Sequence, residues 1–466
     1  MRRFSSSLLA LVALVGACVD HSNTETPGTL VDVNPEPPGA NCKYGGVAIE
    51  SGVDANLNGV LDPSEVTSTQ YVCNADSDVE CGSAQSLKGE VSIKSAADLD
   101  QIGNASCIDG DLVIAGTDLT SMPQLAGLQI VTGSVYVVGN SSLTSLSDLA
   151  GLRAVGSIYF VQANPMLSNI GALAGLERVA SMQIIDNDSL VDLAGFETIT
   201  KLDSVLNISG NKNLTSLTGL DNIVICAEGI IIDSNNALTS TDALDQLQSI
   251  PELEISGNAA LSSISLPALS NVEGVLTINQ NAALTTVSLP QLTAASSGVQ
   301  FEQDTALTTL DLPQLLLSGV VRVTGDTALA SLSAPKLSVV AVDVDLASLP
   351  ALQTADFPAL DTIGGSLFLA VVPLPSFSGF PALTNIGGQM LVQGATATDF
   401  SGLSALQRVD GNVTITANQD LAGFTGLTSF AHIGGGLTVT NNPALTPAIA
   451  QAFASSITID GSITIN

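Results

Sequence analysis

The chain is poor in aromatic and basic residues, and the shortage of bases argues against one class of partner. Its 466 residues include no Trp, 2 His and 12 Lys plus Arg, against 44 Asp plus Glu, which gives a formal net charge of −32. So acidic a chain is a poor partner for nucleic acid. Charged residues make up 12% and hydrophobic residues 45%, a composition too apolar for disorder. No apolar run after residue 17 approaches the roughly 20 residues that span a bilayer, so we expect no membrane-spanning helix in the mature chain.

Residues 1–17 have the features of an export signal. Arginines at positions 2 and 3 precede an apolar run, and the small residues Gly16 and Ala17 come directly before Cys18. The stretch LVGAC at 14–18 resembles a bacterial lipobox, which implies that Cys18 is lipidated and becomes the mature N-terminus. Val19 then favours sorting to the outer membrane of a Gram-negative host. The alternative is an ordinary secretory signal in which Cys18 is incidental.

Composition divides the rest of the chain into three parts. Residues 18–41 are rich in Pro, Thr, Asn and acids and lack apolar periodicity, which predicts a flexible tether. Residues 42–74 are bounded by cysteines, contain two strand-like runs, and resemble a small module of unknown function found in bacterial surface lipoproteins. Residues 81–466 are repetitive. We therefore expect a lipid-anchored protein of the cell envelope, in the outer membrane or on the cell surface, with the membrane as a partner through its N-terminal lipid.

Export permits disulfides among the remaining five cysteines. Proximity pairs Cys42 with Cys73 around the small module, and Cys81 with Cys107 at the start of the repeats. Four cysteines allow three connectivities, so the pairing rests on proximity alone. Cys226 is left within an apolar run, where we expect a buried thiol.

The small module contains a calcium-loop motif. The segment from 54 to 65 matches D-x-[DN]-x-[DN]-G-x5-E, a spacing that supplies a hard cation with six to eight oxygens. The predicted ligands are Asp54, Asn56, Asn58, the Val60 carbonyl, Asp62 and Glu65. The flanks at 45–49 and 69–72 are strand-like, unlike those of an EF-hand. The alternative to calcium as a cofactor is an Asn- and Gly-rich turn without metal.

One sequence motif recurs from about residue 109. It consists of alternating apolar residues, then Asn or Asp, then Leu three positions later. The polar marks are Asn140, Asn164, Asn187, Asn211, Asn235, Asn258, Asn281, Asp304 and Asp326, then Asn418 and Asn442. Within each run they recur at a nearly fixed period of about 23 residues, which is typical of a solenoid. The alternation of apolar residues predicts one strand in each coil. We expect the stacked coils to bury a continuous aliphatic column and the Asn side chains of neighbouring coils to form a hydrogen-bonded ladder. We expect about 14 coils.

The start of the repeat region resembles the receptor L-domain, a right-handed parallel β-helix related in appearance to leucine-rich repeats. The match begins at Cys81-Gly82 and continues through Cys107-Ile108 and Leu112. The resemblance covers residues 81–466 and implies an all-β solenoid of about 23-residue coils that starts with a disulfide-clamped cap. A small disulfide-bounded β module precedes it.

Residues suited to catalysis are scarce in the repeats. Basic residues are scattered singly, and His432 is the one histidine after residue 21. A lone histidine between apolar residues does not suggest an activated nucleophile, so we expect no enzyme. Counting from the Asn marks places Tyr136 and Tyr159 outward on adjacent strands, where they would form an aromatic binding patch. Two tyrosines that only stiffen the sheet are the alternative.

These observations favour a non-catalytic surface protein whose solenoid binds a protein or glycan ligand or mediates adhesion. A passive structural stalk or coat of the envelope is the second hypothesis. A carbohydrate-active β-helix enzyme is the third.

Overall fold

The computed structural model describes residues 29–36, 39–41, 46–53, 61–73, 79–82, 84–170 and 175–466. The chain divides into two compact units, Met1–Asp78 and Val79–Asn466, which are described separately. Within these described ranges no helix is both long and apolar enough to cross a lipid bilayer.

The first unit contains a three-stranded antiparallel sheet with the order β1 (Thr29–Glu36), β2 (Gly46–Val53) and β3 (Val66–Cys73). The two strands predicted in the small module are confirmed as β2 and β3. The prediction of a tether over residues 18–41 is wrong for Thr29–Glu36, because these residues pair along their whole length with β2. Proline misled the prediction: Pro35 lacks an amide donor, but β1 is an edge strand, where that donor is not needed.

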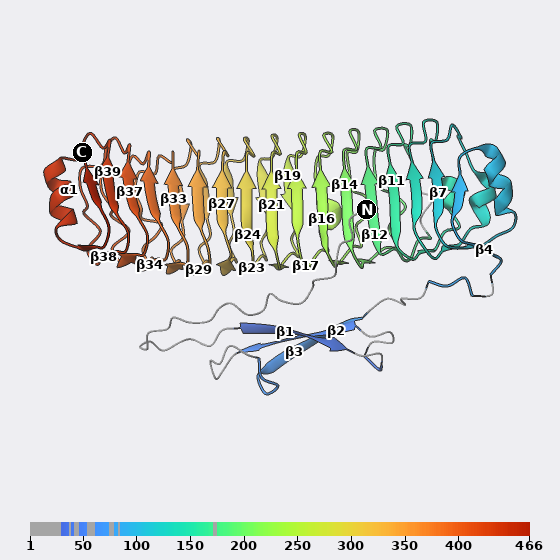
Figure 1. Ribbon diagram of the computed structural model, residues 1–466, viewed down its shortest axis with the longest axis horizontal. Coiled ribbons are helices and arrows are strands. Elements are labelled where there is room, and N and C mark those ends of the chain that lie inside the picture. The colour runs from blue at the N-terminus through green and yellow to red at the C-terminus, as the bar shows by residue number, and fades with distance from the viewer. Residues whose placement is uncertain are drawn as a thin grey trace. The chain divides into compact units, whose positions relative to one another are not determined.

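The second unit is a parallel β-solenoid of about 16 turns, so the fold class expected from the sequence is confirmed (Figure 1). The main sheet has 17 strands among the described residues, and consecutive strands pair in parallel with little change of register. At about 4.8 Å between strands the sheet is roughly 77 Å long, somewhat longer than 14 coils would give. The strands are β5 (Val91–Ile93), β7 (Leu112–Ala115), β9 (Val135–Val138), β11 (Ile158–Gln162), β12 (Ser181–Ile185), β14 (Val205–Ser209), β16 (Gly229–Asp233), β18 (Leu253–Ser256), β21 (Val275–Asn279), β24 (Gly298–Glu302), β27 (Val321–Thr324), β30 (Val344–Ala347), β33 (Leu367–Ala370), β35 (Met390–Gln393), β37 (Val413–Thr416), β39 (Leu437–Thr440) and β41 (Ile463–Ile465).

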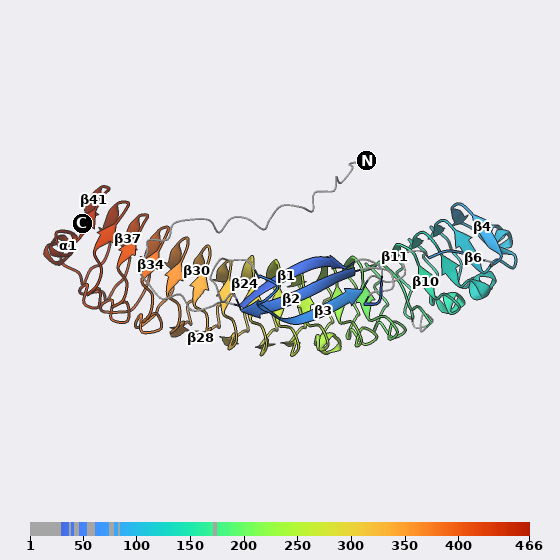
Figure 2. The ribbon, with the colours of Figure 1, turned by 90° about the horizontal axis from the view of Figure 1, so that it is seen from below.

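Shorter strands line the other sides of the coils, and they too pair in parallel (Figure 2). One row comprises β4 (Ser86–Lys88), β6 (Cys107–Asp109), β8 (Ile130–Val131) and β10 (Ala154–Val155). It is followed by β13 (Lys201–Leu202), β15 (Ile225–Cys226), β17 (Ser249–Ile250), β20 (Asn271–Val272), β23 (Ala294–Ala295), β26 (Leu317–Ser318), β29 (Val339–Val340), β32 (Thr362–Ile363), β34 (Asn385–Ile386), β36 (Arg408–Val409), β38 (His432–Ile433) and β40 (Thr458–Ile459). The remaining short strands are β19 (Ser263–Ser265), β22 (Thr286–Ser288), β25 (Thr309–Asp311), β28 (Ser331–Ser333) and β31 (Thr354–Asp356).

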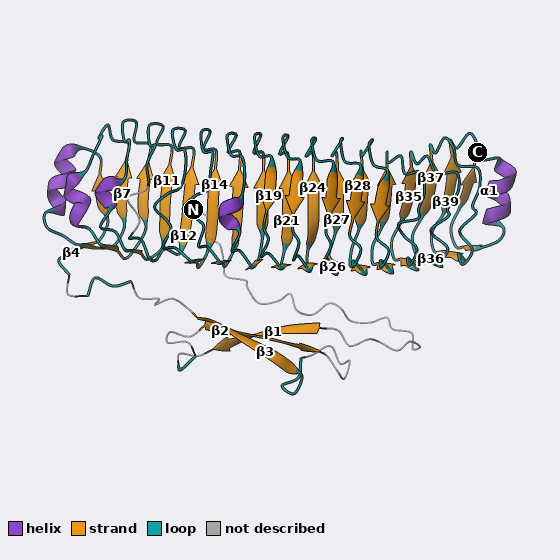
Figure 3. Ribbon diagram, turned by 180° about the vertical axis from the view of Figure 1, so that it is seen from behind, coloured by secondary structure: helices purple, strands orange, loops and turns teal. Residues whose placement is uncertain are grey.

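Helical segments are few in the described ranges: the 3-10 helices lie in the N-terminal half of the solenoid and the α-helix at its C-terminal end (Figure 3). The 3-10 helices are η1 (Ala96–Ile102), η2 (Pro123–Gly127), η3 (Ser147–Leu149) and η5 (Asp242–Leu244). The predicted disulfide Cys81–Cys107 is confirmed and ties the first coils together. At the other end α1 (Pro447–Ala454) begins at the N-cap Thr446, whose hydroxyl accepts from the Ile449 amide, and it buries Ala450 and Ala454 against the last coils.

The interior is a continuous apolar column, mostly aliphatic. Alternate residues of each main strand point inward, and the leucines after the polar mark, such as Leu143, Leu146, Leu149 and Leu152, are fully buried. Cys226 is a buried free thiol, as expected. Its Sγ lies 3.0 Å from the Gly229 carbonyl oxygen, and burial raises the pKa of this thiol to about 11.

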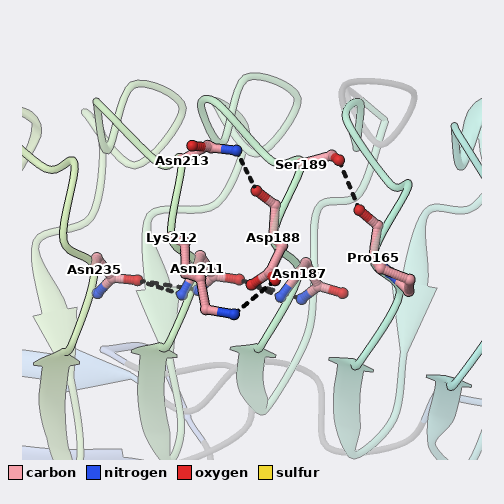
Figure 4. Close-up of polar contacts among 8 residues, drawn as sticks. All are labelled: Pro165, Asn187, Asp188, Ser189, Asn211, Lys212, Asn213 and Asn235. Carbon is pink, nitrogen blue, oxygen red and sulfur yellow. Dashed lines mark hydrogen bonds and ion pairs between the residues drawn. The ribbon is translucent and has the colours of Figure 1, made fainter.

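The polar marks form a buried side-chain ladder at the end of the main strands (Figure 4). The Asn211 amide Nδ2 donates to the Ile184 carbonyl of the preceding coil at 2.9 Å and to Asn235 Oδ1 of the next coil at 3.1 Å. Its Oδ1 accepts from the backbone N–H of Asn187 at 3.0 Å. The same contacts recur from Asn140 to Asn281. Each rung therefore satisfies backbone groups that the turn would leave without partners.

The ladder is interrupted after Asp326 and resumes at Asn418. The corresponding positions carry the buried apolar residues Leu349, Val372 and Ala395. Stacked phenylalanines fill the core of this region and continue to the end of the solenoid: ring centroids are 5.3 Å apart for Phe377–Phe400, 5.7 Å for Phe400–Phe424 and 4.0 Å for Phe424–Phe453. The main sheet continues through these coils in register.

The residue directly before each ladder position adopts a left-handed backbone. Gly139 and Gly210 suit this conformation, and Ala163 and Asp186 also adopt it, with φ of 55°. In the ladder-free coils Val371 occupies the same position with φ of 60°. A β-branched residue is strained there.

Candidate binding face

The outward face of the main sheet carries one aligned side chain from each strand. In register order, this row is Ser92, Val113, Tyr136, Phe160, Gln183, Asn207, Ile231, Glu254, Thr277, Gln300, Arg322, Asp345, Phe368, Leu391, Thr414, Thr438 and Thr464. All but the last are half-buried, because neighbours in the row cover one another's flanks. The row is the longest regular surface of the solenoid.

The prediction that Tyr159 lies outward is wrong. Tyr159 is fully buried, pairs in register with the inward Val135, and has its ring centroid 6.0 Å from that of Phe196. Tyr136 lies four residues before Asn140, and the residue four before Asn164 is Phe160. Tyr159 lies 23 residues after Tyr136, whereas the two Asn marks are 24 apart, so the count to Tyr159 is one residue short. Because the side-chain period of a strand is two, a slip of one residue moves a side chain to the opposite face.

Burial has a chemical consequence for Tyr159. Its hydroxyl oxygen has no hydrogen-bond partner in the described structure, and burial raises the pKa of this phenol well above its usual value. A neutral phenol in the core acts as a packing residue. It contributes nothing to the binding face.

Phe160 takes the outward place that the sequence assigned to Tyr159. It lies beside Tyr136 on the adjacent strand, with ring centroids 6.0 Å apart and ring planes tilted by 56°. Val113 continues the row on the other side of Tyr136. These three residues, Val113, Tyr136 and Phe160, are called here the aromatic patch. Tilted aromatic rings with one phenolic hydroxyl offer both stacking and hydrogen bonding to a ligand.

The middle of the row is polar and acidic. Glu254 lies in the row and Asp233 lies on the neighbouring strand beside it; their carboxylates are 3.0 and 2.8 Å from Ser256 Oγ, which can donate its one proton to either. Further along, Arg322 Nε lies 3.3 Å from Asp345 Oδ2. Because this ion pair is partly exposed, it contributes little to the stability of the fold. Its main effect is to fix the orientation of the two side chains on the surface.

A second apolar pair, Phe368 and Leu391, follows Asp345 on the same face. Sequence reasoning missed it, because the loss of the Asn mark after Asp326 removed the landmark for the register. Phe377 of the same region is buried in the phenylalanine stack. The outward row therefore has an apolar pair on either side of its polar centre.

Most of the predicted calcium ligands lie outside the described residues: Asp54, Asn56, Asn58 and Val60. Of the other two, Glu65 Oε2 accepts from the Asp62 backbone N–H at 3.0 Å, and the Glu65 N–H donates to the Asp62 carbonyl at 2.8 Å. These bonds close a turn that leads into β3. In the described part of the chain no group of three or more His, Cys, Asp or Glu residues is arranged to hold a metal ion.

The other predicted site residues of the N-terminal unit are described in part or not at all. Cys18 and Cys42 lie outside the described residues, and Cys73 is described only as the last backbone residue of β3. In the solenoid, His432 Nε2 lies 3.0 Å from Asp460 Oδ2 on the surface.

Comparison with known proteins gives one family match. Residues 29–73 match the model of a domain of unknown function, DUF7151, which spans the three strands of the first unit. No curated protein matches the chain. Among solved structures, the crystal structure of a TLR13–ssRNA13 complex is similar at 14% identity over 80% of this chain and 70% of that chain, with a TM-score of 0.18. At that TM-score the likeness supports no argument about this chain.

Proposed function

We propose that this chain is an exported, lipid-anchored, non-catalytic surface protein whose solenoid binds a protein or glycan ligand. The aromatic patch is the observation that carries the proposal. A stacked solenoid needs apolar side chains inside, and nothing in its packing requires Tyr136 and Phe160 on the outer face. Adjacent half-exposed aromatic rings on a largely polar sheet mark a binding surface.

The surroundings of the patch favour recognition over catalysis. Its neighbours along the row are Val113 on one side and Gln183 on the other, neither of which can act as acid, base or nucleophile. Further along the sheet, Asp233 and the row residue Glu254 both lie within hydrogen-bond distance of the Ser256 hydroxyl. The Gln183 amide beside the aromatic rings, with these carboxylates further along the sheet, suits a hydroxyl-rich or peptide ligand.

A protein and glycan array probed with the full chain in detergent tests this function. We expect specific binding that falls at least about tenfold in the double variant Tyr136→Ala with Phe160→Ala, because truncating two aromatic anchors typically costs about 2 kcal/mol or more. The control is Phe368→Ala with Leu391→Ala, which removes a similar apolar pair from the same face and is expected to keep the binding.

Two results would contradict the binding proposal. Equal binding by the wild type and the Tyr136/Phe160 variant would remove the patch as the site. No specific binding by any form of the chain would favour a passive stalk of the envelope.

Lipid anchoring rests on the lipobox-like stretch that ends at Cys18. Labelling cells with a palmitate analogue is expected to mark the chain and place it in the membrane fraction. The variant Cys18→Ser is expected to lose both the label and the membrane association. A wild-type chain that is exported without label would instead support the ordinary secretory signal.

Calcium in the 54–65 loop is proposed from the spacing of its oxygen donors. Calorimetry with calcium is expected to give binding heat that Glu65→Gln reduces, because one carboxylate charge is lost at the closing position. Ser64→Ala, in the same turn, is the control. Titration heats equal to those of the chelated protein would exclude the site.

A further inference from the structure

Two rungs of the buried ladder are acids instead of amides. Asp304 and Asp326 follow seven asparagine rungs, and both side chains are fully buried. Asp304 Oδ1 takes the usual acceptor role, since it accepts from the Asn281 backbone N–H at 2.8 Å and from Asn281 Nδ2 at 3.1 Å. Asp326 Oδ1 accepts from the Asp304 N–H at 2.7 Å. The ladder geometry is therefore preserved through one oxygen of each acid.

The second oxygen of each acid has no partner. Asp304 Oδ2 and Asp326 Oδ2 are buried and form no hydrogen bond in the described structure. In an asparagine rung this position is the amide nitrogen: Asn281 Nδ2 donates to the carbonyls of Ile255 and Asn279, both at 3.0 Å. The strand register places the carbonyls of Ile278 and Glu302 at the equivalent positions around Asp304. An ionised carboxylate would there oppose acceptor oxygens, with no donor between them.

Within the described coils around the two acids, no cation offsets their charges. Arg322 pairs with Asp345, and Lys336 Nζ bonds to Gln314. Asp311 and Asp343, which also belong to these coils, are acids and supply no positive charge. Glu302, at the end of β24, and Asp304 both oppose ionisation of Asp326.

We propose that Asp304 and Asp326 form a buried proton-binding site, in which each carboxyl is protonated in the folded solenoid and its hydroxyl replaces the asparagine amide as donor. Only a proton restores the donor that each position requires. The site would bind protons as the pH falls and release them as it rises, which makes this part of the solenoid sensitive to the pH of its surroundings.

The direction in which folding stability changes with pH follows from the pKa shifts of both carboxyl groups. Burial raises the pKa of Asp304 from 3.8 to about 6, and burial with the neighbouring acids raises the pKa of Asp326 to about 7. The unfolded chain therefore releases protons at lower pH than the folded chain. Stability from these groups is greatest below about pH 4 and is lost as the pH rises towards 7.

Urea unfolding of the full chain at a series of pH values tests the site. The double variant Asp304→Asn with Asp326→Asn supplies the amide donors at every pH. We expect the folding equilibrium constant of the wild type to fall relative to this variant by about tenfold or more between pH 4 and pH 8. The control variant Asp311→Asn with Asp356→Asn removes the same formal charge from exposed positions on β25 and β31, and it is expected to follow the wild-type pH profile.

Infrared spectroscopy gives an independent readout that does not depend on unfolding. At pH 5 the folded wild type is expected to show stronger protonated-carboxyl absorbance than the Asp304/Asp326 variant, and the control is expected to keep this excess. A wild-type stability that stays parallel to that of the variant across pH, or protonated-carboxyl absorbance equal in the folded wild type and the variant, would overturn the proposal.

Discussion

The coils from Asn140 to Asp326 and the coils from Leu349 to Ala395 have the same backbone and different interiors. In the first region a buried polar ladder satisfies backbone groups at the end of each main strand. In the second the ladder position is apolar, and stacked phenylalanines occupy the core. The sheet continues through both in register. The stacking of strands therefore defines this fold. The hydrogen bonds of the ladder and the packing of phenylalanine rings are two alternative ways to stabilise the turns between strands.

The largest expected effect is in the phenylalanine region. Phe400 is fully buried between Phe377 and Phe424. Phe400→Ala is expected to lower the free energy of unfolding by about 3–5 kcal/mol, because it leaves a cavity in the stack. Phe368→Ala, on the half-exposed outward face, is the control and should cost clearly less in urea unfolding. Equal losses for the two variants would mean that the stack does not hold these coils.

Next in size is the loss of a ladder rung. Asn211→Ala removes two hydrogen bonds accepted by Oδ1 and three acceptor contacts shared by the two N–H groups of Nδ2 inside the solenoid. We expect urea unfolding to show a loss of about 2–4 kcal/mol, since each buried group left without a partner costs about 1–3 kcal/mol and part of this cost is relieved by relaxation.

The matched control for this rung is two residues away. Asn213 Nδ2 donates to the Asp188 carbonyl at 2.8 Å, but its side chain is exposed (Figure 4). Asn213→Ala should change the unfolding free energy by less than about 0.5 kcal/mol. A ladder variant as stable as this control would refute the energetic role of the ladder.

The smallest effect is a gain of stability at a strained turn. Val371 is exposed by 53% and has a φ of 60°. Val371→Gly is expected to raise the melting temperature, because glycine relieves a left-handed strain of about 1–2 kcal/mol and little packing is lost. Val339→Gly, at an exposed valine in the strand β29, should lower it. A lower melting temperature for Val371→Gly would show that this valine contributes through packing.

Much of this architecture follows from the sequence, since alternating apolar residues and a regular Asn mark define both the strand and its stacking. The Cys81–Cys107 bridge was predicted from proximity, and the burial of Cys226 from its apolar run. The outward row could also be predicted where the Asn mark is present, because its residue lies four positions before each mark, which gives Phe160 before Asn164. The prediction of Tyr159 was one residue short of that position, and a single residue decides which face a side chain occupies. The second apolar pair was missed where the mark disappears, although Phe377, Phe400 and Phe424 keep nearly the same spacing and could have marked these coils.

The central claim is that each coil is held mainly by its neighbours, with the ladder and the phenylalanine stack acting in separate parts of one solenoid. Hydrogen exchange of the full chain, read by mass spectrometry in the wild type and in Asn211→Ala, tests it most directly. We predict amide exchange at least about tenfold faster in strands β12, β14 and β16, with wild-type rates in β33, β35 and β37. Faster exchange spread evenly along all strands would contradict the claim.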